Sequence, residues 1–295
     1  MRKRLISLLV LFGLAGSAAP QISVDVNLVV LNPVVRDRKG QFASDLREGN
    51  FQVYEDGVRQ TIQLFRHEDI PVTVGLVVDH SGSMRPKLTD VITAARTFVQ
   101  SSRPDDQMFV VNFNEKVTLA VPDVIQSGNR SEALARAIAG TPTTGRTALY
   151  DAALEAFRQL RAGGPEKKVL IVISDGGDNV SSHKLAEVLK TAEESSVLVY
   201  TIGIFDDEDD DKNPGVLTRL ARATGGEAFF PREHDEVEAI CQSIARDIRN
   251  QYTIGYVSGN SARAGAWRSI RLTAAAAGHD KLQVRTRSGY LAESK

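Results

Sequence analysis

Apolar residues along the chain follow two different patterns, one in the flanks and one in the middle. Residues 22–68 are rich in valine and partly alternate apolar with polar, which is typical of strands with one buried face. Within them, Asp56-Gly57 separates two alternating runs and predicts a tight hairpin, because both turn residues tolerate positive φ. After Asn250 the chain returns to strand-like runs: "QYTIGYVS", "AWRSIRLTA" and "KLQVRTRSGYL".

The middle of the chain alternates short apolar runs with helical periodicity. The runs are nearly continuous, as expected for strands covered on both faces: "VTVGLVVD", "QMFVVNFN", "KVTLAV", "KKVLIVIS", "SVLVYTIGI" and "EAFF". Helical spacing fills most of the intervals, at residues 86–100, 131–138, 148–161, 183–194, 214–223 and 233–250. Pro86 and Pro214 stand where the first turn of a helix tolerates proline. This pattern predicts an α/β fold: a doubly wound, mostly parallel sheet with helices on both faces and a hairpin at one edge.

The two β-rich flanks are each too short to bury a core of their own. We predict that residues 22–69 and 251–292 pair into one small β-sandwich-like domain, with the α/β domain of residues 70–250 inserted between them. The alternative is two unrelated flaps packed on the main domain. Trp267 and the tyrosines near it are expected in the core of the sandwich.

The N-terminal 19 residues have the pattern of an export signal. Arg2, Lys3 and Arg4 precede an apolar stretch from Leu5 to Leu14, and small residues follow. The apolar stretch is shorter than the roughly 20 residues that span a bilayer. We therefore expect a cleaved signal peptide and a secreted or periplasmic protein without a membrane span; a retained N-terminal anchor is the alternative.

Composition narrows the range of partners and chemistries. The formal net charge of −1 provides no basic field for nucleic acid or an anionic membrane. Cys241 is the single cysteine, so no intramolecular disulfide forms, and its helical spacing with apolar neighbours predicts a small buried side chain. The five histidines lack zinc-site spacing, and neither a phosphate-binding loop nor a G-x-S-x-G elbow is present.

Two aspartates stand at the carboxyl ends of predicted buried strands, where open α/β sheets place their binding crevice. Asp79 ends "VTVGLVVD" and is followed by Ser81 and Ser83, while Asp175 follows "VLIVIS". Hydroxyl and carboxylate oxygens suit hard divalent cations. Ser81 and Ser83 could aim both oxygens at one point, and Thr147 could add a third from another loop.

Each of these residues also has a purely structural interpretation. Asp79 or Ser83 could cap the helix that begins near Pro86, Thr147 could cap the helix that begins at Ala148, and Asp175 could brace a glycine-rich turn. Their joint occurrence at matching strand ends favours a metal site over separate capping and turn roles.

The pattern Asp79-x-Ser81-x-Ser83 resembles the metal-ion-dependent adhesion site of the von Willebrand factor A domain. "TTGRTALYDAALEA" resembles the threonine loop of that family, with Thr147 at the coordinating position, and "VISDGGDN" resembles its second aspartate loop, with Asp175 at the matching place. The likeness covers roughly residues 72–250. The flanks look, more loosely, like those of exported bacterial proteins related to this domain.

The resemblance implies a role for each position. The serines and the threonine would bind the ion directly, Asp79 and Asp175 would act through bound waters, and Asp178 could orient a water in a second layer. The ion would be Mg²⁺, with Mn²⁺ and Ca²⁺ as alternatives. An open coordination position would accept an aspartate or glutamate side chain of a partner protein.

These observations predict a binding module for adhesion or assembly rather than an enzyme. A metal-assisted hydrolase is the main alternative, for which sequence offers His80 or loop acids as the base. A domain with a vestigial metal site, whose partner is chosen by the β sandwich, is the third. The acidic run from Asp206 to Asp211 is expected to be a solvated loop.

Overall fold

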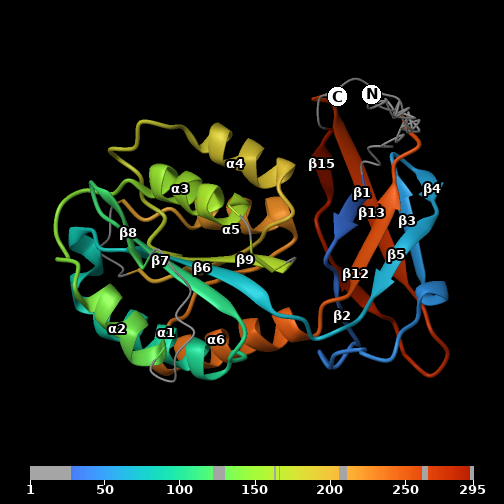
Figure 1. Cartoon of the computed structure of the whole chain (residues 1–295), viewed down its shortest axis with the longest axis horizontal. Helices are drawn as coiled ribbons and strands as arrows, with labels where there is room; N and C mark the ends of the chain where they lie inside the picture. Colours follow the sequence, from blue (N-terminus) through green and yellow to red (C-terminus); the bar gives the residue numbers. More distant parts are fainter. Residues whose placement is uncertain are drawn as a thin grey trace, which may run out of the picture.

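A computed structural model describes residues 28–121, 130–162, 164–165, 167–205, 211–260 and 265–292. The predicted export signal and residues 206–210 of the acidic run lie outside this part of the chain. An α/β domain lies beside a smaller β domain, and the chain crosses between them twice (Figure 1). None of the helices in the described ranges has the length and apolar character needed to cross a membrane.

A six-stranded sheet forms the centre of the α/β domain. Its strands lie in the order β11 (Ala228–Phe229), β10 (Leu198–Gly203), β9 (Lys167–Ser174), β6 (Val72–Asp79), β7 (Gln107–Phe113) and β8 (Val117–Val121). All neighbours are parallel except β7 and β8, which form the predicted edge hairpin. Every residue of β6 is buried, because helices cover both faces.

Helices cover the two faces of this sheet in two groups (Figure 1). One face carries α1 (Leu88–Gln100), α2 (Arg130–Ala139) and α6 (His234–Arg249); the other carries α3 (Leu149–Arg161), α4 (Leu185–Glu194) and α5 (Pro214–Thr224). The predicted doubly wound α/β fold is confirmed. Pro214 opens α5 as expected, whereas Pro86 lies in a short 3-10 helix, η2 (Gly82–Lys87), that precedes α1. Cys241 is buried, and its burial raises the thiol pKa to about 12.

The β domain joins strands from both ends of the chain. One sheet has the order β1 (Leu28–Leu31), β12 (Thr253–Val257), β5 (Ile62–Arg66); another has the order β15 (Gly289–Leu291), β13 (Trp267–Ala274), β3 (Phe51–Glu55), β4 (Val58–Gln60); and β14 (Gln283–Arg285) pairs with β2 (Val34–Arg36). A 3-10 helix, η1 (Glu48–Asn50), leads into β3. Each sheet thus contains strands from before and after the α/β domain, and one apolar cluster is shared between them. The predicted pairing of the flanks is confirmed.

Local geometry in the β domain confirms one prediction and corrects another. Asp56 and Gly57 form the hairpin turn with φ of 48° and 80°, as their identity predicts. Trp267, expected in the core, is 46% exposed. In β13 the buried positions include Ile270 and Leu272, so alternation turns Trp267 to the outer face and places Arg268 inside.

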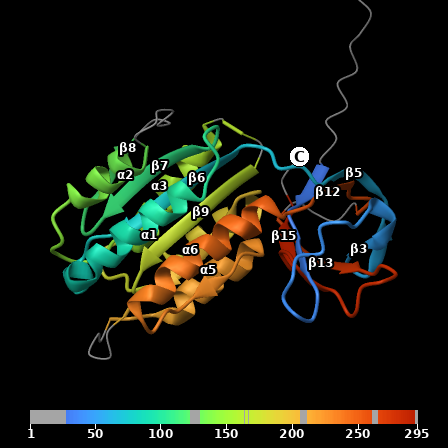
Figure 2. The same cartoon turned by 90° about the horizontal axis from the view of Figure 1, so that it is seen from below.

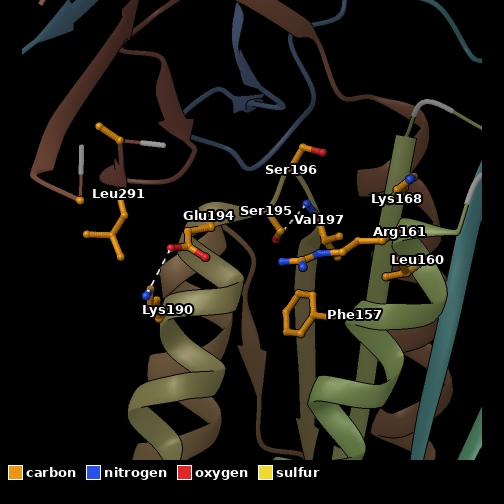
Figure 3. Close-up of a pocket in the computed structure, with 12 residues that line it drawn as sticks. Phe157, Leu160, Arg161, Lys168, Lys190, Glu194, Ser195, Ser196, Val197 and Leu291 are labelled. Atoms are coloured by element: carbon orange, nitrogen blue, oxygen red, sulfur yellow. Dashed lines mark hydrogen bonds and ion pairs between the residues drawn. The ribbon is translucent and has the colours of Figure 1, made fainter. Parts of the chain in front are cut away.

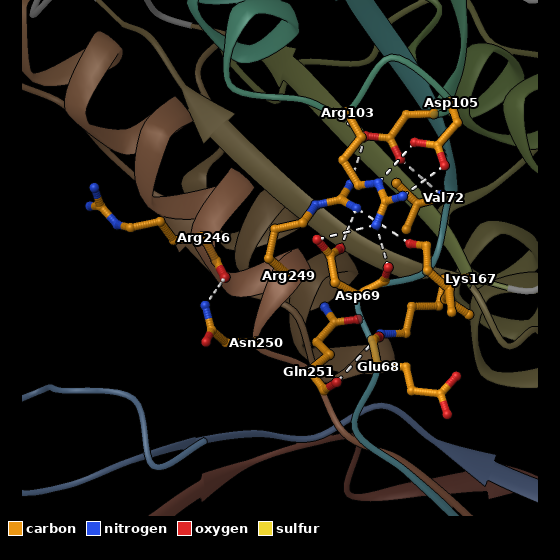
Figure 4. Close-up of polar contacts among 12 residues, drawn as sticks. Glu68, Asp69, Val72, Arg103, Asp105, Lys167, Arg246, Arg249, Asn250 and Gln251 are labelled. Atoms are coloured by element: carbon orange, nitrogen blue, oxygen red, sulfur yellow. Dashed lines mark hydrogen bonds and ion pairs between the residues drawn. The ribbon is translucent and has the colours of Figure 1, made fainter. Parts of the chain in front are cut away.

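Polar contacts fix the two chain crossings between the domains (Figure 4). Arg249, at the end of α6, pairs with Asp106 at 2.7 Å. The ammonium group of Lys167 donates hydrogen bonds to backbone carbonyl oxygens on both crossings, to Glu68 at 3.2 Å and to Gln251 at 3.4 Å. The crossings are therefore held against each other at the amino end of β9.

A buried ion cluster joins α6 to the β domain. Asp247 is 0% exposed, and its carboxylate accepts hydrogen bonds from Arg36 of β2 at 2.5 Å and from Arg285 of β14. The Tyr200 hydroxyl donates to the same carboxylate at 3.4 Å. Figure 2 shows α6 running along the α/β domain toward the β domain, so this cluster ties the end of that helix to both flanks.

Candidate functional site

The candidate site lies where the order of strands reverses. From β6 the chain proceeds outward to β7 and β8, whereas from β9 it proceeds in the opposite direction to β10 and β11. Loops diverge at such a switch point and leave a crevice beyond the carboxyl ends of the strands. Asp79 is the last residue of β6 and Asp175 follows β9, so both predicted aspartates lie at this crevice.

The Asp79 carboxylate is held from both sides by the two strand ends. It accepts a hydrogen bond from the Ser81 backbone N–H at 2.8 Å and another from the Ser174 hydroxyl at 2.6 Å. Its burial and the nearby Asp175 carboxylate raise the pKa of Asp79 to about 7. The carboxylate is therefore fixed in position but poorly stabilised as an anion.

Two serine hydroxyls connect the Asp79 turn to Asp175. The hydroxyl oxygens of Ser81 and Ser83 lie 3.1 Å apart, and Ser83 donates to an Asp175 carboxylate oxygen at 2.5 Å. The other Asp175 carboxylate oxygen accepts from the Gly177 N–H at 2.9 Å. The structure thus brings four of the five predicted residues into one hydrogen-bonded cluster, which we call the Asp-Ser cluster: Asp79, Ser81, Ser83 and Asp175.

The loop that carries Thr147 lies between the two aspartate loops. On one side the Gly82 N–H donates to the Gly145 carbonyl at 3.1 Å. On the other, the Thr147 N–H donates to the Asn179 side-chain oxygen and the Asn179 N–H donates to the Thr147 carbonyl, each at 3.0 Å. The Thr147 hydroxyl has no hydrogen-bond partner among the residues described. The Thr147 hydroxyl is therefore not engaged by another described residue, and its loop is hydrogen-bonded to both aspartate loops.

The helix-capping alternatives do not hold. The N-cap residues of η2, α1 and α3 are Ser81, Lys87 and Ala148, and none of them makes a capping hydrogen bond with its own side chain. The first turn of α3 is instead capped from the loop after β9: Asp178 accepts from the Tyr150 N–H at 3.1 Å, and Ser181 accepts from the Asp151 N–H at 3.2 Å. Burial raises the pKa of Asp178.

Asp178 therefore has a structural contact that the sequence did not indicate. It links the second aspartate loop to the helix that follows Thr147. Asn179 acts similarly on Thr147 itself. Neither the capping by Asp178 nor the contact of Asn179 with Thr147 could be predicted from local sequence. Residues from a distant loop leave no sequence pattern at the start of the helix.

No lysine or arginine in the described part of the chain neutralises the carboxylates of the Asp-Ser cluster. Neither Asp79 nor Asp175 forms an ion pair with a lysine or arginine of the residues described, although both are at most 2% exposed. Those residues also contain no group of three or more histidine, cysteine, aspartate or glutamate side chains that could hold a metal. A cation here would depend on hydroxyl ligands. Carboxylate and hydroxyl oxygens are the donors that Mg²⁺, Mn²⁺ and Ca²⁺ prefer, so this set of residues fits such an ion.

His80 does not form a catalytic arrangement with its neighbours. Its ring is buried, burial lowers its pKa, and the groups that oppose this shift are the Asn112 side chain and the Thr141 backbone. The ring therefore does not contact the Ser81 hydroxyl or the Asp79 carboxylate by hydrogen bonding.

A cavity of about 910 Å³ lies at the opposite edge of the sheet (Figure 3). It is lined by the ends of α3 and α4, by the amino end of β9, and by Leu291 of the β domain. Its position at the amino ends of the strands separates it from the Asp-Ser cluster.

Comparison with known proteins agrees with the fold. The family model for the von Willebrand factor type A domain matches residues 73–243. The chain belongs to this family. The match spans the described sheet from β6 into α6.

Relatives share this domain in very different proteins. Inter-alpha-trypsin inhibitor heavy chain H2 of Mus musculus is 27% identical over 219 residues, which are 68% of this chain and 22% of the mouse protein. A von Willebrand factor type A structure from Catenulispora acidiphila is similar over 92% of this chain and 74% of that chain, with a TM-score of 0.55 and 15% identity. The von Willebrand factor domain of the type V pili tip protein Mfa5 from Porphyromonas gingivalis covers 61% of this chain and 95% of its own, with a TM-score of 0.51 and 13% identity.

Proposed function

We propose that this protein is an exported, divalent-cation-dependent binding module that captures an acidic side chain of a partner protein. The observation that carries the proposal is the Asp-Ser cluster at the switch point of the sheet: two buried carboxylates, joined by serine hydroxyls and without a basic partner among the described residues. Burying unpaired charge is unfavourable, so this arrangement favours a site completed by a cation.

The roles of the residues follow from their contacts. The hydroxyls of Ser81, Ser83 and Thr147 would bind the ion directly, and Asp79 and Asp175 would hold water molecules around it. When bound, Mg²⁺ (or Mn²⁺ or Ca²⁺) supplies a coordination position for a carboxylate from the partner. Ser174 and the Ser81 N–H would orient Asp79, and Asn179 would hold Thr147 in place.

Adhesion or assembly in the cell envelope is the setting that we propose. The type V pili tip protein Mfa5 contains a von Willebrand factor domain of the same fold. The predicted signal peptide would place this protein in the periplasm or outside the cell. Neither nucleic acid nor a membrane is part of the proposal, since the chain carries a formal net charge of only −1.

Binding rather than catalysis is proposed because a hydrolase needs a base beside the ion. The nearest histidine, His80, is buried without hydrogen-bond contact to the Asp-Ser cluster.

Calorimetric titration of Mg²⁺ and Mn²⁺ into the protein tests the proposal. We expect saturable binding by the wild type and none by Asp79→Ala. Asp280→Ala is the matched control, because its side chain is 69% exposed on the β domain and loses the same charge. A pull-down from envelope extract should then recover a partner in Mg²⁺ and lose it in EDTA. Unchanged metal binding by Asp79→Ala would refute the proposal.

A further inference from the structure

A pair of stacked aromatic rings lies at the same edge of the sheet as the Asp-Ser cluster. Phe205 follows β10 and Phe230 follows β11, and their ring centroids are 5.6 Å apart with an interplanar angle of 27°. Phe230 is 38% exposed, the most exposed large apolar side chain that the structure describes in the α/β domain. We call these two residues the Phe pair.

Strand register places the Phe pair level with the metal-binding loops. Gly203 of β10 is paired with Ser174 of β9, and the Ile204 N–H donates to the Ser174 carbonyl at 3.3 Å. Ile204 is therefore level with Asp175, and Phe205 lies one residue further along. Neighbouring strands lie about 4.8 Å apart, so a point midway between the ends of β6 and β9 is about 7 Å from the end of β10 and about 12 Å from the end of β11.

The rings are held in place by the backbone beneath them. A Cβ added at Gly203 would lie 2.7 Å from the Phe230 ring and 2.9 Å from the Phe205 ring, so the pair rests directly on a strand position without a side chain. Phe205 also packs against the apolar cluster under α3, α4 and α5. Rigid aromatic groups lose little conformational freedom on binding, which makes a fixed, half-exposed pair an effective anchor.

We propose that the Phe pair is a second contact site for the partner, and that the partner presents an apolar or aromatic side chain two residues away from its metal-directed carboxylate. In an extended segment, side chains two residues apart lie on the same face and about 7 Å from each other. This spacing matches the distance from the strand ends at the Asp-Ser cluster to the end of β10, where the Phe230 ring lies over Gly203. The partner segment is thus an acidic and apolar extended peptide, and this inference rests on the proposed metal-dependent capture.

A random dodecapeptide library displayed on phage provides the probe, because it assumes no natural partner. The wild-type protein is immobilised in Mg²⁺, and bound phage are eluted with EDTA. We expect the eluted sequences to share an aspartate or glutamate with an aromatic or large aliphatic residue two positions away. Selection on Phe230→Ser should retain the acidic residue and lose the apolar one.

Val58→Ser is the matched control, since Val58 is 65% exposed on β4 of the β domain and should leave the selected pattern unchanged. A selected peptide and its variant with the apolar residue replaced by alanine then measure the contact. We expect the replacement to weaken binding to the wild type about tenfold, or about 1.4 kcal/mol, and to have little effect with Phe230→Ser. Thermal unfolding and Mg²⁺ titration of Phe230→Ser show whether the variant is folded, and Phe230→Leu provides a milder change if it is not.

The outcomes separate this inference from the proposed function. Acidic sequences without an apolar preference, or a preference that survives Phe230→Ser, would overturn the role of the Phe pair while leaving metal-dependent capture intact. If neither the wild type nor Asp79→Ala selected any peptide that EDTA elutes, both the role of the Phe pair and the proposed metal-dependent capture would be overturned.

Discussion

Buried carboxylates occur both at the domain junction and at the candidate site. They differ in their partners: arginine side chains surround the carboxylate at the junction, whereas uncharged groups hold the carboxylate at the candidate site. Asp247 and Asp79 are each 0% exposed. Asp247 receives two guanidinium groups, from Arg36 and Arg285. Asp79 receives a serine hydroxyl and a backbone N–H, and has a second carboxylate beside it.

The difference teaches what each region is built for. Isolated charges are costly to bury. At the junction, Arg36 of β2 and Arg285 of β14 neutralise the Asp247 carboxylate, so the pairing there serves stability. At the switch point the chain supplies no arginine to Asp79 or Asp175 among the residues described. The missing positive charge is the physical basis for proposing an external cation there.

Removal of the Asp247 carboxylate should have the largest effect on stability. Asp247→Ala leaves Arg36 without the carboxylate that it contacts and leaves Arg285 with Glu227, 3.6 Å away. Since the two arginine side chains are only 32% and 26% exposed, we expect a loss of about 3 kcal/mol in unfolding free energy. Denaturant titration measures it. Asp280→Ala, which breaks a pair 64% and 69% exposed, should change stability by less than about 1 kcal/mol. Equal effects of the two variants would show that the junction cluster is not stabilising.

Addition of the missing cation should stabilise the other region. At a Mg²⁺ concentration about 100 times its dissociation constant, the wild type should gain about 2.7 kcal/mol, seen as a rise of several degrees in the thermal midpoint. Asp79→Ala should show no Mg²⁺-dependent rise, whereas Asp247→Ala should retain it. A comparable rise in Asp79→Ala would place the ion elsewhere.

Neutralisation of one site carboxylate should stabilise the metal-free protein. In EDTA at neutral pH, Asp79→Asn should increase the unfolding free energy by about 2 kcal/mol, because it removes a buried charge next to Asp175 while keeping an oxygen for the Ser81 N–H. The sign is opposite to that for Asp247→Ala. Destabilisation of similar size would mean that the carboxylate is compensated after all.

A third carboxylate, Asp151, is compensated by a titratable partner at the surface. His183 Nδ1 lies 2.8 Å from the Asp151 carboxylate, and this hydrogen bond raises the pKa of His183. Since the pKa of the folded state lies above that of the unfolded state, the stabilisation is complete below about pH 6.5 and is lost as pH rises through the raised value. Glu187 of α4 adds to it.

NMR titration of His183 in the wild type and in Asp151→Asn checks this smallest effect. The pKa should fall toward its ordinary value in the variant. An unchanged pKa would remove Asp151 as its cause.

Much of the fold could be predicted from the spacing of apolar residues along the sequence. Continuous apolar runs marked all six strands of the α/β sheet, and Asp56-Gly57 marked the hairpin. Trp267 was misplaced although a signal existed: Ile270 and Leu272 define the inner face of β13, and Trp267 has the other parity. The large apolar side chain of Trp267 suggested burial, whereas the alternation of buried and exposed positions in β13 places it on the outer face.

The site was predictable in part, because strand ends are local features. Asp79, Ser81, Ser83 and Asp175 could be brought together by the rule that carboxyl ends of parallel strands share an edge. The cap that Asp178 gives to α3 and the hold of Asn179 on Thr147 join residues about 30 positions apart. No periodicity relates such pairs.

By itself the sequence determined which segments form strands and helices, and which strand ends carry oxygen ligands, because burial and backbone preference act over a few residues. Only the tertiary structure decided which charges would meet. Arg36 contacts Asp247 across 211 positions, and Phe205 contacts Phe230 through neighbouring strands. Asp79 lies near Asp175 and has no lysine or arginine partner among the described residues. Such contacts between distant residues depend on the order and register of whole strands. Strand order and register are in turn fixed by packing over the entire molecule.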